Sequence, residues 1–526
     1  MKSVNNFVSR LRTFEDICGL KINSLKTEAI SLGKHPLHKL PNNIKWNTNP
    51  VKVLGVYLSQ NLDEAYSANI SNKLKKIKQL LNSWKQRKLT LIGKVLIIKS
   101  LAVSQIIYLA NLQPFPDESI KEFERLFYEF LWGGTTHKIK KSIIVQNYDS
   151  GGQKMIDLKL INQVQKLKWV RFYLNNHNCI WKKTMENLIK VNNLNLLLRG
   201  NIQVKNIPQT TKFYTEVLMA LEYLNTIGNN NDISKQYVFY NRHLSINRNI
   251  MYDNSLFEAG AWRVEDLFNS NGHVIPFSEW KRRGVTDKSF LVWRGLVQKI
   301  KTIKATNRLT NENMDKLNDL SFSLKSGQIV DILNSKTRDI YDKLISQNIC
   351  KLTNKAMNKY STMYELKQED WQEIYTTYRL CTNDNQIKEL QYKILHRYIP
   401  TNKLLFQMGK VASNKCTFCE LYDETIEHVF FHCHCIRDLW FHIEHKFQIA
   451  ENLTISFSVA DVLLGYGKHN ESTLGNQNVH INTVLLYVKY HIWKCKISGI
   501  KPTKQSLMVD LKNHGMFVPY FKTFVR

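Results

Sequence analysis

The chain has 526 residues and a formal net charge of +30, from 74 Lys and Arg against 44 Asp and Glu. This length is too great for one compact core, and roughly three domains of about 150 residues are expected. Nine cysteines, mostly scattered singly, argue against a disulfide scaffold and favour an intracellular location, in the nucleus or cytoplasm. The positive charge predicts polyanionic partners, RNA or DNA.

The sequence predicts no membrane segment. "VLIIKSLAVSQIIYLANL" is the most apolar stretch, but it contains Lys99 and is expected to form a buried helix. The N-terminus lacks the apolar run of a signal peptide.

The first sixty residues are predicted to mix helix and strand. Phe7, Leu11 and Phe14 lie at helical spacing, and Gly19 suits a helix C-cap. "KTEAISLG" and "VKVLGVYLS" are typical of short strands, and the second can bend at Gly55.

From about 65 to 134 the pattern is helical. One apolar stripe consists of Ile70, Leu74, Ile77, Leu81 and Trp84. Thr90 is predicted to N-cap the next helix, and Ser119 with Glu122 is a possible capping box for a third helix that stops at Gly133. Residues 61–100 contain nine basic residues and only two acidic ones.

Residues 155–400 are predicted to be mostly helical. Trp280 and Trp293 lie among Lys and Arg, an interleaving that suits base stacking and phosphate contact. An amphipathic core helix explains the same residues equally well.

The pattern C-x2-C-x8-H-x4-C, formed by Cys416, Cys419, His428 and Cys433, has the spacing of metal ligands. A tight C-x2-C turn can direct two thiolates at one ion, and four ligands of this type close a tetrahedron without an open position. We therefore predict structural Zn²⁺. His432 and Cys435 compete with Cys433 for the fourth place, and buried cysteines beside surface histidines are the alternative to a metal site.

The sequence contains none of several common catalytic motifs. It contains no P-loop, H-E-x-x-H or G-x-S-x-G motif, and no Asp-Asp dipeptide. We interpret His396 as a packed or capping residue instead of a base. No catalytic residue is predicted.

The motifs together resemble the C-terminal half of a non-LTR (LINE-type) retrotransposon reverse transcriptase. "CGLKINSLKTEAISLG" is similar to the palm segment after the catalytic strand, "VKVLGVYLS" to the primer-grip strand, and "SGGQKMIDL" and "IPTNKLL" to later segments. The thumb signature is matched by Trp84, Arg87, Leu89, Leu91, Gly93, Lys94 and Lys99. "CTFCELYDETIEHVFFHC" resembles the zinc-binding module downstream of such enzymes.

The resemblance implies a mainly α fold with a small α/β N-terminal part. Its expected domains are a palm remnant (1–60), a helical thumb-like region (61–150), a helical linker region (151–374), a zinc-binding domain (375–445) and a C-terminal helical extension (446–526). Family members polymerise DNA with Mg²⁺ held by aspartates, and this chain is expected to begin after those ligands. It is therefore expected to be inactive alone as an RNA-directed DNA polymerase.

Three hypotheses follow. The first is a truncated retrotransposon product that binds zinc and template, primer or target nucleic acid; its expected phosphate contacts are Lys73, Lys76, Arg87, Lys88 and Lys94, for which a solvated basic face is the alternative. The second is a fragment of a longer active polymerase with a misassigned start. The third is an interaction protein that the host retains for its zinc lobe.

Overall fold

The structure is a computed structural model that describes residues 2–23, 26–31, 45–47, 50–175, 179–228, 233–245, 252–304, 320–347, 354–451, 454–467 and 476–514. The described residues are mostly helical, as predicted, and their strands form two-stranded sheets of two or three residues a strand. The chain divides into two compact units. The first consists of Met1–Trp84, Ser100–Leu126 and Asp157–Leu344, and the second of Lys85–Lys99, Phe127–Ile156 and Ile345–Arg526.

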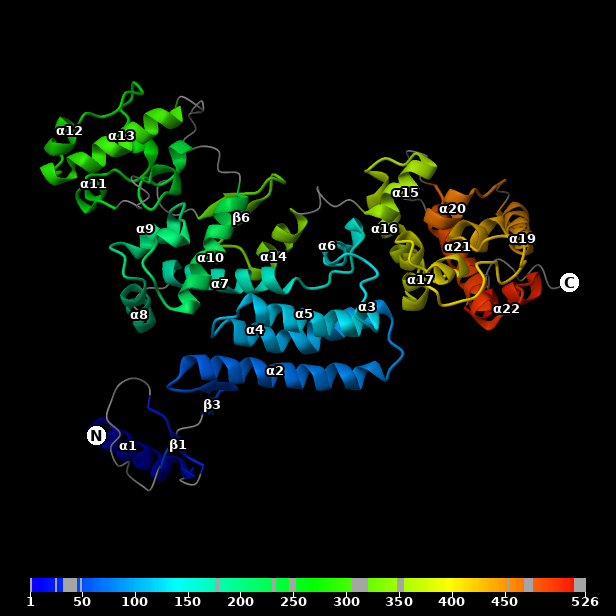
Figure 1. The fold of residues 1–526 in the computed structure, drawn as a ribbon, viewed down its shortest axis with the longest axis horizontal. Helices are drawn as coiled ribbons and strands as arrows, with labels where there is room; N and C mark the ends of the chain where they lie inside the picture. Colours follow the sequence, from blue (N-terminus) through cyan, green and yellow to red (C-terminus); the bar gives the residue numbers. More distant parts are fainter. Residues whose placement is uncertain are drawn as a thin grey trace. The chain divides into compact units, whose positions relative to one another are not determined.

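The first unit opens with helix α1 (Lys2–Cys18), shown at the N-terminus in Figure 1. The helix ends where the sequence predicted, because Gly19 adopts a φ of +72° and its N–H donates to the carbonyl of Glu15. Strands β1 (Glu28–Ala29) and β2 (Lys45–Trp46) pair in parallel. The predicted α/β character of this end is therefore confirmed.

The segment "VKVLGVYLS" forms a hairpin, whereas the sequence analysis expected one strand with a bend at Gly55. Strands β3 (Val51–Val53) and β4 (Val56–Leu58) pair antiparallel. The two residues between them, Leu54 and Gly55, have φ values of +48° and +86°, which suit a tight hairpin turn. The bulky residue at a positive φ hid this turn, since such positions usually hold Gly, Asn or Asp.

Helices α2 (Leu62–Lys85), α4 (Ser104–Ala110) and α5 (Asp117–Trp132) follow. The side chain of Asn69 on α2 fixes the hairpin, because its amide accepts from the N–H of Tyr57 at 2.7 Å and donates to the Tyr57 carbonyl at 2.9 Å. Helix α5 begins two residues before Ser119, so the proposed capping box is wrong. It ends as predicted at Gly133, which has a φ of +72°.

Helix α7 (Leu158–Asn175) of the first unit packs against α10 (Lys212–Ile227) and against α4. Lys166 on α7 is fully buried; its ammonium donates to the carbonyls of Ala110 and Gln113, each at 2.7 Å, and pairs with Glu216 at 3.1 Å. The remaining elements are α8 (Ile180–Ile189), α9 (Leu194–Arg199), α11 (Asn254–Glu258), α12 (Phe277–Arg282), α13 (Phe290–Lys304), the hairpin β5 (Ser321–Ser323) with β6 (Ile329–Asp331), and α14 (Thr337–Ser346).

The two tryptophans of the basic-aromatic stretch belong to α12 and α13. Trp280 is fully buried, and the ring of Trp293 packs against Phe277 and Phe290, with centroids 5.5 and 5.9 Å away. A fully buried indole offers no face to a base, so the packed-helix interpretation holds for Trp280.

The second unit contains α3 (Leu91–Ile97), α6 (Lys141–Ile144) and the helices that gather at the C-terminal end of the chain in Figure 1. These are α15 (Lys355–Tyr364), α16 (Asp370–Cys381), α17 (Asn385–Leu395), α18 (Asn402–Gln407), α19 (His434–Glu451), α20 (Val459–Leu464), α21 (Asn476–Ser498) and α22 (Lys504–Asn513). Helix α21 is central, because it contacts α16, α17 and α22 and buries a broad apolar face that includes Val484, Val488 and Ile492.

Thr90 caps α3 as predicted, with its hydroxyl accepting from the N–H of Gly93. Among the described residues, one helical stretch, Leu91–Ala110, is long and apolar enough to cross a membrane by length and composition. Lys94 and Lys99 lie within it, and the Lys94 ammonium donates to the carbonyl of Leu131. Of the apolar window in this stretch 33% is buried inside the protein, so the buried helix that the sequence analysis expected is borne out only in part.

Candidate metal centre

A tight turn after residue 415 carries the first two cysteines. The N–H of Glu420 donates to the carbonyl of Cys416 at 2.9 Å, and the N–H of Phe418 points at the Cys416 sulfur at 3.4 Å. Glu420 closes the turn with a φ of +58°. This backbone shape directs the sulfurs of Cys416 and Cys419 to the same side.

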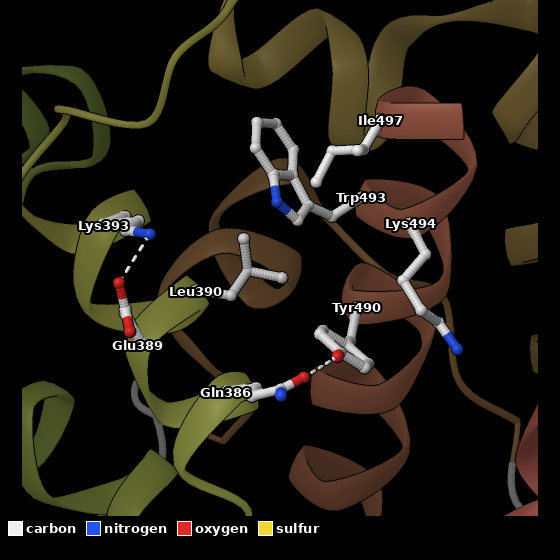
Figure 2. Close-up of a pocket in the computed structure, with 8 residues that line it drawn as sticks. All are labelled: Gln386, Glu389, Leu390, Lys393, Tyr490, Trp493, Lys494 and Ile497. Atoms are coloured by element: carbon white, nitrogen blue, oxygen red, sulfur yellow. Dashed lines mark hydrogen bonds and ion pairs between the residues drawn. The ribbon is translucent and has the colours of Figure 1, made fainter. Parts of the chain in front are cut away.

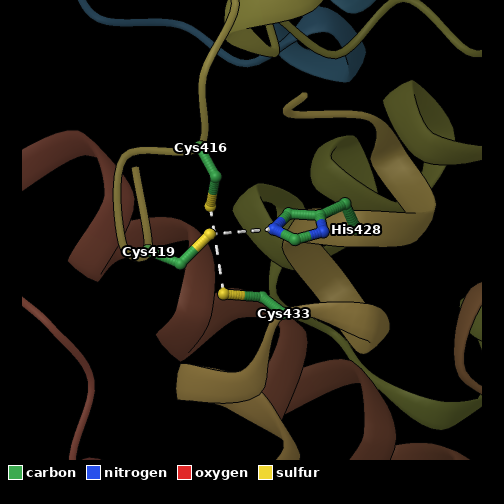
Figure 3. A group of neighbouring side chains, drawn as sticks. All are labelled: Cys416, Cys419, His428 and Cys433. Carbon is green, nitrogen blue, oxygen red and sulfur yellow. Dashed lines mark hydrogen bonds between the residues drawn. The ribbon is translucent and has the colours of Figure 1, made fainter. Parts of the chain in front are cut away.

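His428 begins a π-helical turn, His428–His432, and Cys433 is the residue directly after that turn. The N–H of Cys433 donates to the carbonyl of His428 at 2.9 Å, a bond that spans five residues instead of the four of an α-helix. The wider turn places both side chains on the side that faces the cysteine turn, as Figure 3 shows.

The four side chains converge on one point. The atoms that each could offer to a metal lie within 4.8 Å of one another. The sulfurs of Cys416 and Cys433 are 3.9 Å apart, and the sulfur of Cys419 is 3.4 Å from Nε2 of His428. A tetrahedron with zinc–sulfur bonds of about 2.3 Å has edges of about 3.8 Å between sulfurs and slightly shorter edges to nitrogen. The donor set therefore fits zinc in number, type and spacing.

The competing candidates for the fourth position point elsewhere. Cys433 is fully buried and lies in one group with Cys416, Cys419 and His428. The thiol of Cys435 lies 3.7 Å from the carbonyl of Phe418, and His432 is exposed, with its ring against Phe431. Leu439 and Trp440, which follow these residues in the chain, are buried in the adjoining core.

The two buried thiols act as a pair. The hydrogen bond from Cys433 lowers the pKa of Cys416 to about 5, although burial opposes the change. The same hydrogen bond, burial and the charge on Cys416 raise the pKa of Cys433. Ionising both thiols without a cation is unfavourable, whereas binding of a divalent metal would release their protons.

Glu424 supports the cysteine turn from behind. Its carboxylate is fully buried and accepts from the N–H and hydroxyl of Thr417, at 2.9 and 2.8 Å, and from the N–H of Asn402 at 2.7 Å. The ammonium of Lys496 on α21 pairs with it at 2.6 Å. Burial raises the pKa of Glu424, but these donors outweigh it and the net pKa is lowered. One charged side chain thus joins the turn, the start of α18 and α21.

Sequence reasoning missed Glu424 and Lys496. Their 72-residue separation, from 424 to 496, has no periodicity that could link them. The spacing of cysteines and histidine reveals ligands but not the groups that hold the ligand turn in place.

His396 is a packed residue in the structure. It is buried, its ring stacks on Tyr375 with centroids 5.7 Å apart, and Nδ1 lies 3.3 Å from the amide nitrogen of Asn354. Burial lowers its pKa to about 3, so it is neutral at physiological pH. This agrees with its interpretation as a packed side chain.

The predicted phosphate contacts divide between the two units. Lys73 and Lys76 lie on α2 in the first unit, Lys76 exposed and Lys73 half-buried. Burial and the neighbouring charges of Lys76 and Lys52 lower the pKa of Lys73. This part of α2 is therefore a cluster of mutually repelling cations.

Arg87, Lys88 and Lys94 lie in the second unit. Arg87 and Lys88 are exposed in the loop before α3, whereas Lys94 is half-buried. Burial lowers the pKa of Lys94, Glu389 opposes this, and Lys138, Lys393 and Lys85 lower it further. The sequence analysis did not single out Lys138 or Lys393, because α17 and the segment before α6 are distant from α3 in the chain.

Comparison with known proteins places residues 353–440 in a family described as "zinc-binding in reverse transcriptase". This match includes all four converging side chains. Over 160 residues the chain is 29% identical to a Xenopus laevis protein, "Transposon TX1 uncharacterized 149 kDa protein". That segment covers 29% of this chain and 12% of the relative, so the chain spans about an eighth of that protein. The domain boundaries expected from the sequence, at 60, 150, 374 and 445, stay a prediction.

Proposed function

Since the chain carries the zinc-binding domain of a non-LTR (LINE-type) retrotransposon reverse transcriptase, we propose that it binds RNA or DNA and that structural Zn²⁺ folds its second unit. The convergence of three sulfurs and one imidazole nitrogen within 4.8 Å is the observation that supports the metal. Four protein ligands leave no position for a substrate or water, so the proposed role is structural.

The zinc proposal is tested with matched cysteine variants. Purified chain is expected to contain one equivalent of zinc, and Co²⁺ in its place should give the absorption of a tetrahedral site with thiolate ligands. Cys433→Ser should lose the metal, whereas Cys435→Ser, two residues away, should keep it. Equal zinc content in the two variants would show that Cys433 is not a ligand.

The net charge of +30 and the clustered lysines of α2 support the nucleic-acid proposal. Binding of single strands should weaken with salt, the slope of log affinity against log salt being roughly −0.7 for each phosphate contact. Lys73→Gln with Lys76→Gln should reduce that slope by roughly 1.4. Lys205→Gln, an exposed lysine in another part of the first unit, should leave it unchanged.

We also propose that this chain alone does not extend a primer and that it acts inside the cell. Among the described residues, two groups of side chains could hold a metal: the four-residue cluster, and the adjacent Cys433, His434 and Cys435. Both groups consist of cysteine and histidine and contain no carboxylate of the kind that holds Mg²⁺. A primer-extension assay with Mg²⁺ tests the first statement, and DNA synthesis by the purified chain would contradict it.

A further inference from the structure

A groove of about 230 Å³ lies between α17 and α21, within the second unit and separate from the four converging metal-site side chains. Each helix presents four residues to it at positions i, i+3, i+4 and i+7. Figure 2 shows the two rows facing each other. Such spacing makes one continuous helix face on each side.

One part of the groove is apolar. Leu390 is buried at its floor, and Trp493 and Ile497 project into it from α21. Ile497 is 70% exposed, while Trp493 is half-buried and packs against Phe430, whose ring lies 6.4 Å away at 29° to the indole. The indole is therefore a fixed aromatic surface beside an apolar side chain that faces solvent.

The ends of the groove are polar. At one end the hydroxyl of Tyr490 donates to the amide oxygen of Gln386. At the other end Lys393 pairs with Glu389 at 2.7 Å. The ammonium of Lys494 pairs with Asp510 at 2.5 Å, so this residue lines the groove with its stem.

A group of lysines from three other segments lies beside Lys393. Lys94 interacts with Lys138, Lys393 and Lys85, and Lys138 interacts with Lys393 and Lys410. Burial lowers the pKa of both Lys94 and Lys138, and repulsion from their neighbours adds to this change. The Glu389 carboxylate attracts both ammonium groups; one of its oxygens pairs with Lys393, and the other accepts from the N–H of Leu91 at 2.9 Å. The cluster carries more positive charge than this carboxylate balances.

We propose that this groove binds an unpaired nucleotide of single-stranded RNA or DNA, with the base against Trp493 and Ile497 and the flanking phosphates at Lys393 and Lys138. The inference rests on the proposed nucleic-acid binding and assigns it a site. An aromatic face beside clustered lysines is complementary to a flat base linked to phosphates. A paired base keeps both faces stacked inside its duplex, so the groove selects single strands.

The test compares an oligonucleotide with the same oligonucleotide that lacks its bases, using the zinc-loaded full chain and fluorescence anisotropy. Trp493→Leu should weaken binding of the intact strand by roughly 5- to 150-fold, the range typical of one lost base stack. It should leave binding of the abasic strand unchanged. Phe441→Leu, a 55% exposed aromatic residue on α19 in the same unit, should weaken neither.

A second variant guards against loss of folding. Ile497→Asp places a carboxylate at an exposed groove position and should weaken binding of both strands while zinc content stays at one equivalent. Photocrosslinking with 5-iodouridine should join the strand to the α21 peptide that contains Trp493.

The outcomes separate this inference from the function on which it rests. Salt-dependent binding that neither groove variant changes would overturn the site and leave the proposed function intact, and the groove would then serve another kind of partner. No binding of any strand by the unmodified chain would overturn both.

Discussion

Glu424 shows how a single buried charge can organise the metal centre. Replacing it with Gln keeps the shape of the side chain but leaves the Lys496 ammonium, whose side chain is 8% exposed, without its counter-charge. Breaking a buried pair of this kind costs about 3–5 kcal/mol, since the remaining charge stays desolvated. We expect Glu424→Gln to lower the unfolding free energy of the second unit by this amount, measured by urea denaturation of the zinc-loaded chain.

Asp423 provides the matched control for Glu424. It is adjacent in the chain, but its side chain is 39% exposed, and it pairs with Lys403 and Lys415 at 3.3 and 3.6 Å. Exposed pairs contribute at most about 1 kcal/mol. Asp423→Asn should therefore lower the unfolding free energy far less than Glu424→Gln. Equal losses in the two variants would show that burial of Glu424 does not determine its contribution to stability.

His396 gives the second unit a specific response to acid. Its pKa falls from about 6.5 in the unfolded chain to about 3 in the folded one, so the unfolded state binds more protons between these values. Folding stability is therefore highest above pH 6.5 and declines as the pH falls. By pH 5 the loss from this residue should be about 2 kcal/mol.

The contribution of His396 is measured as a difference between variants. His396→Gln should flatten the decline of unfolding free energy between pH 6.5 and 5, because glutamine binds no proton in either state. His445→Gln replaces an exposed histidine on α19 and should retain the slope. If His396→Gln kept the full slope, other groups would account for the acid response.

At the scale of whole elements, short-range signals predicted most helix ends. Gly19, Gly133 and Thr90 each terminate or begin a helix where the sequence placed the boundary, because a cap needs only its own residue and its immediate neighbours. The C-x2-C-x8-H-x4-C spacing is similarly local, so the four converging side chains were found. The groove between α17 and α21 was not, since its two rows lie about a hundred residues apart and meet only through packing.

The Gly151–Gly152 pair belongs to the "SGGQKMIDL" segment, which the sequence analysis used only for the family resemblance. A Cβ on Gly152 would lie 1.9 Å from the carbonyl oxygen of Gln146, and backbone atoms cannot move aside as a flexible side chain can. We expect Gly152→Ala to destabilise the second unit by about 1–3 kcal/mol or more, as overpacking does. Thermal unfolding of the two variants measures this effect. Gly134→Ala, whose Cβ would meet no atom within 4 Å, should leave the unfolding temperature nearly unchanged.

At the scale of the molecule, the second unit is assembled from segments distant in sequence. The hydroxyl of Tyr392 donates to the carbonyl of Gly151 at 3.2 Å, and the guanidinium of Arg379 donates to the side chain of Gln153 at 3.0 Å. The cysteine turn reaches the same core through Glu424 and α21. The 127–156 segment and the metal centre therefore depend on one packed core.

Removing zinc from the full chain tests this dependence. A structural zinc contributes on the order of 10 kcal/mol to a small module, and the rest of the unit relies on the core that the metal centre completes. With a chelator, amide hydrogen exchange should accelerate in residues 401–440 and also near Gly151, far away in sequence. Helices α7 and α10, which pack within the first unit, should keep their protection. Faster exchange confined to 401–440 would show that the zinc lobe folds independently of the 127–156 segment, and unchanged exchange throughout would show that the fold does not need the metal.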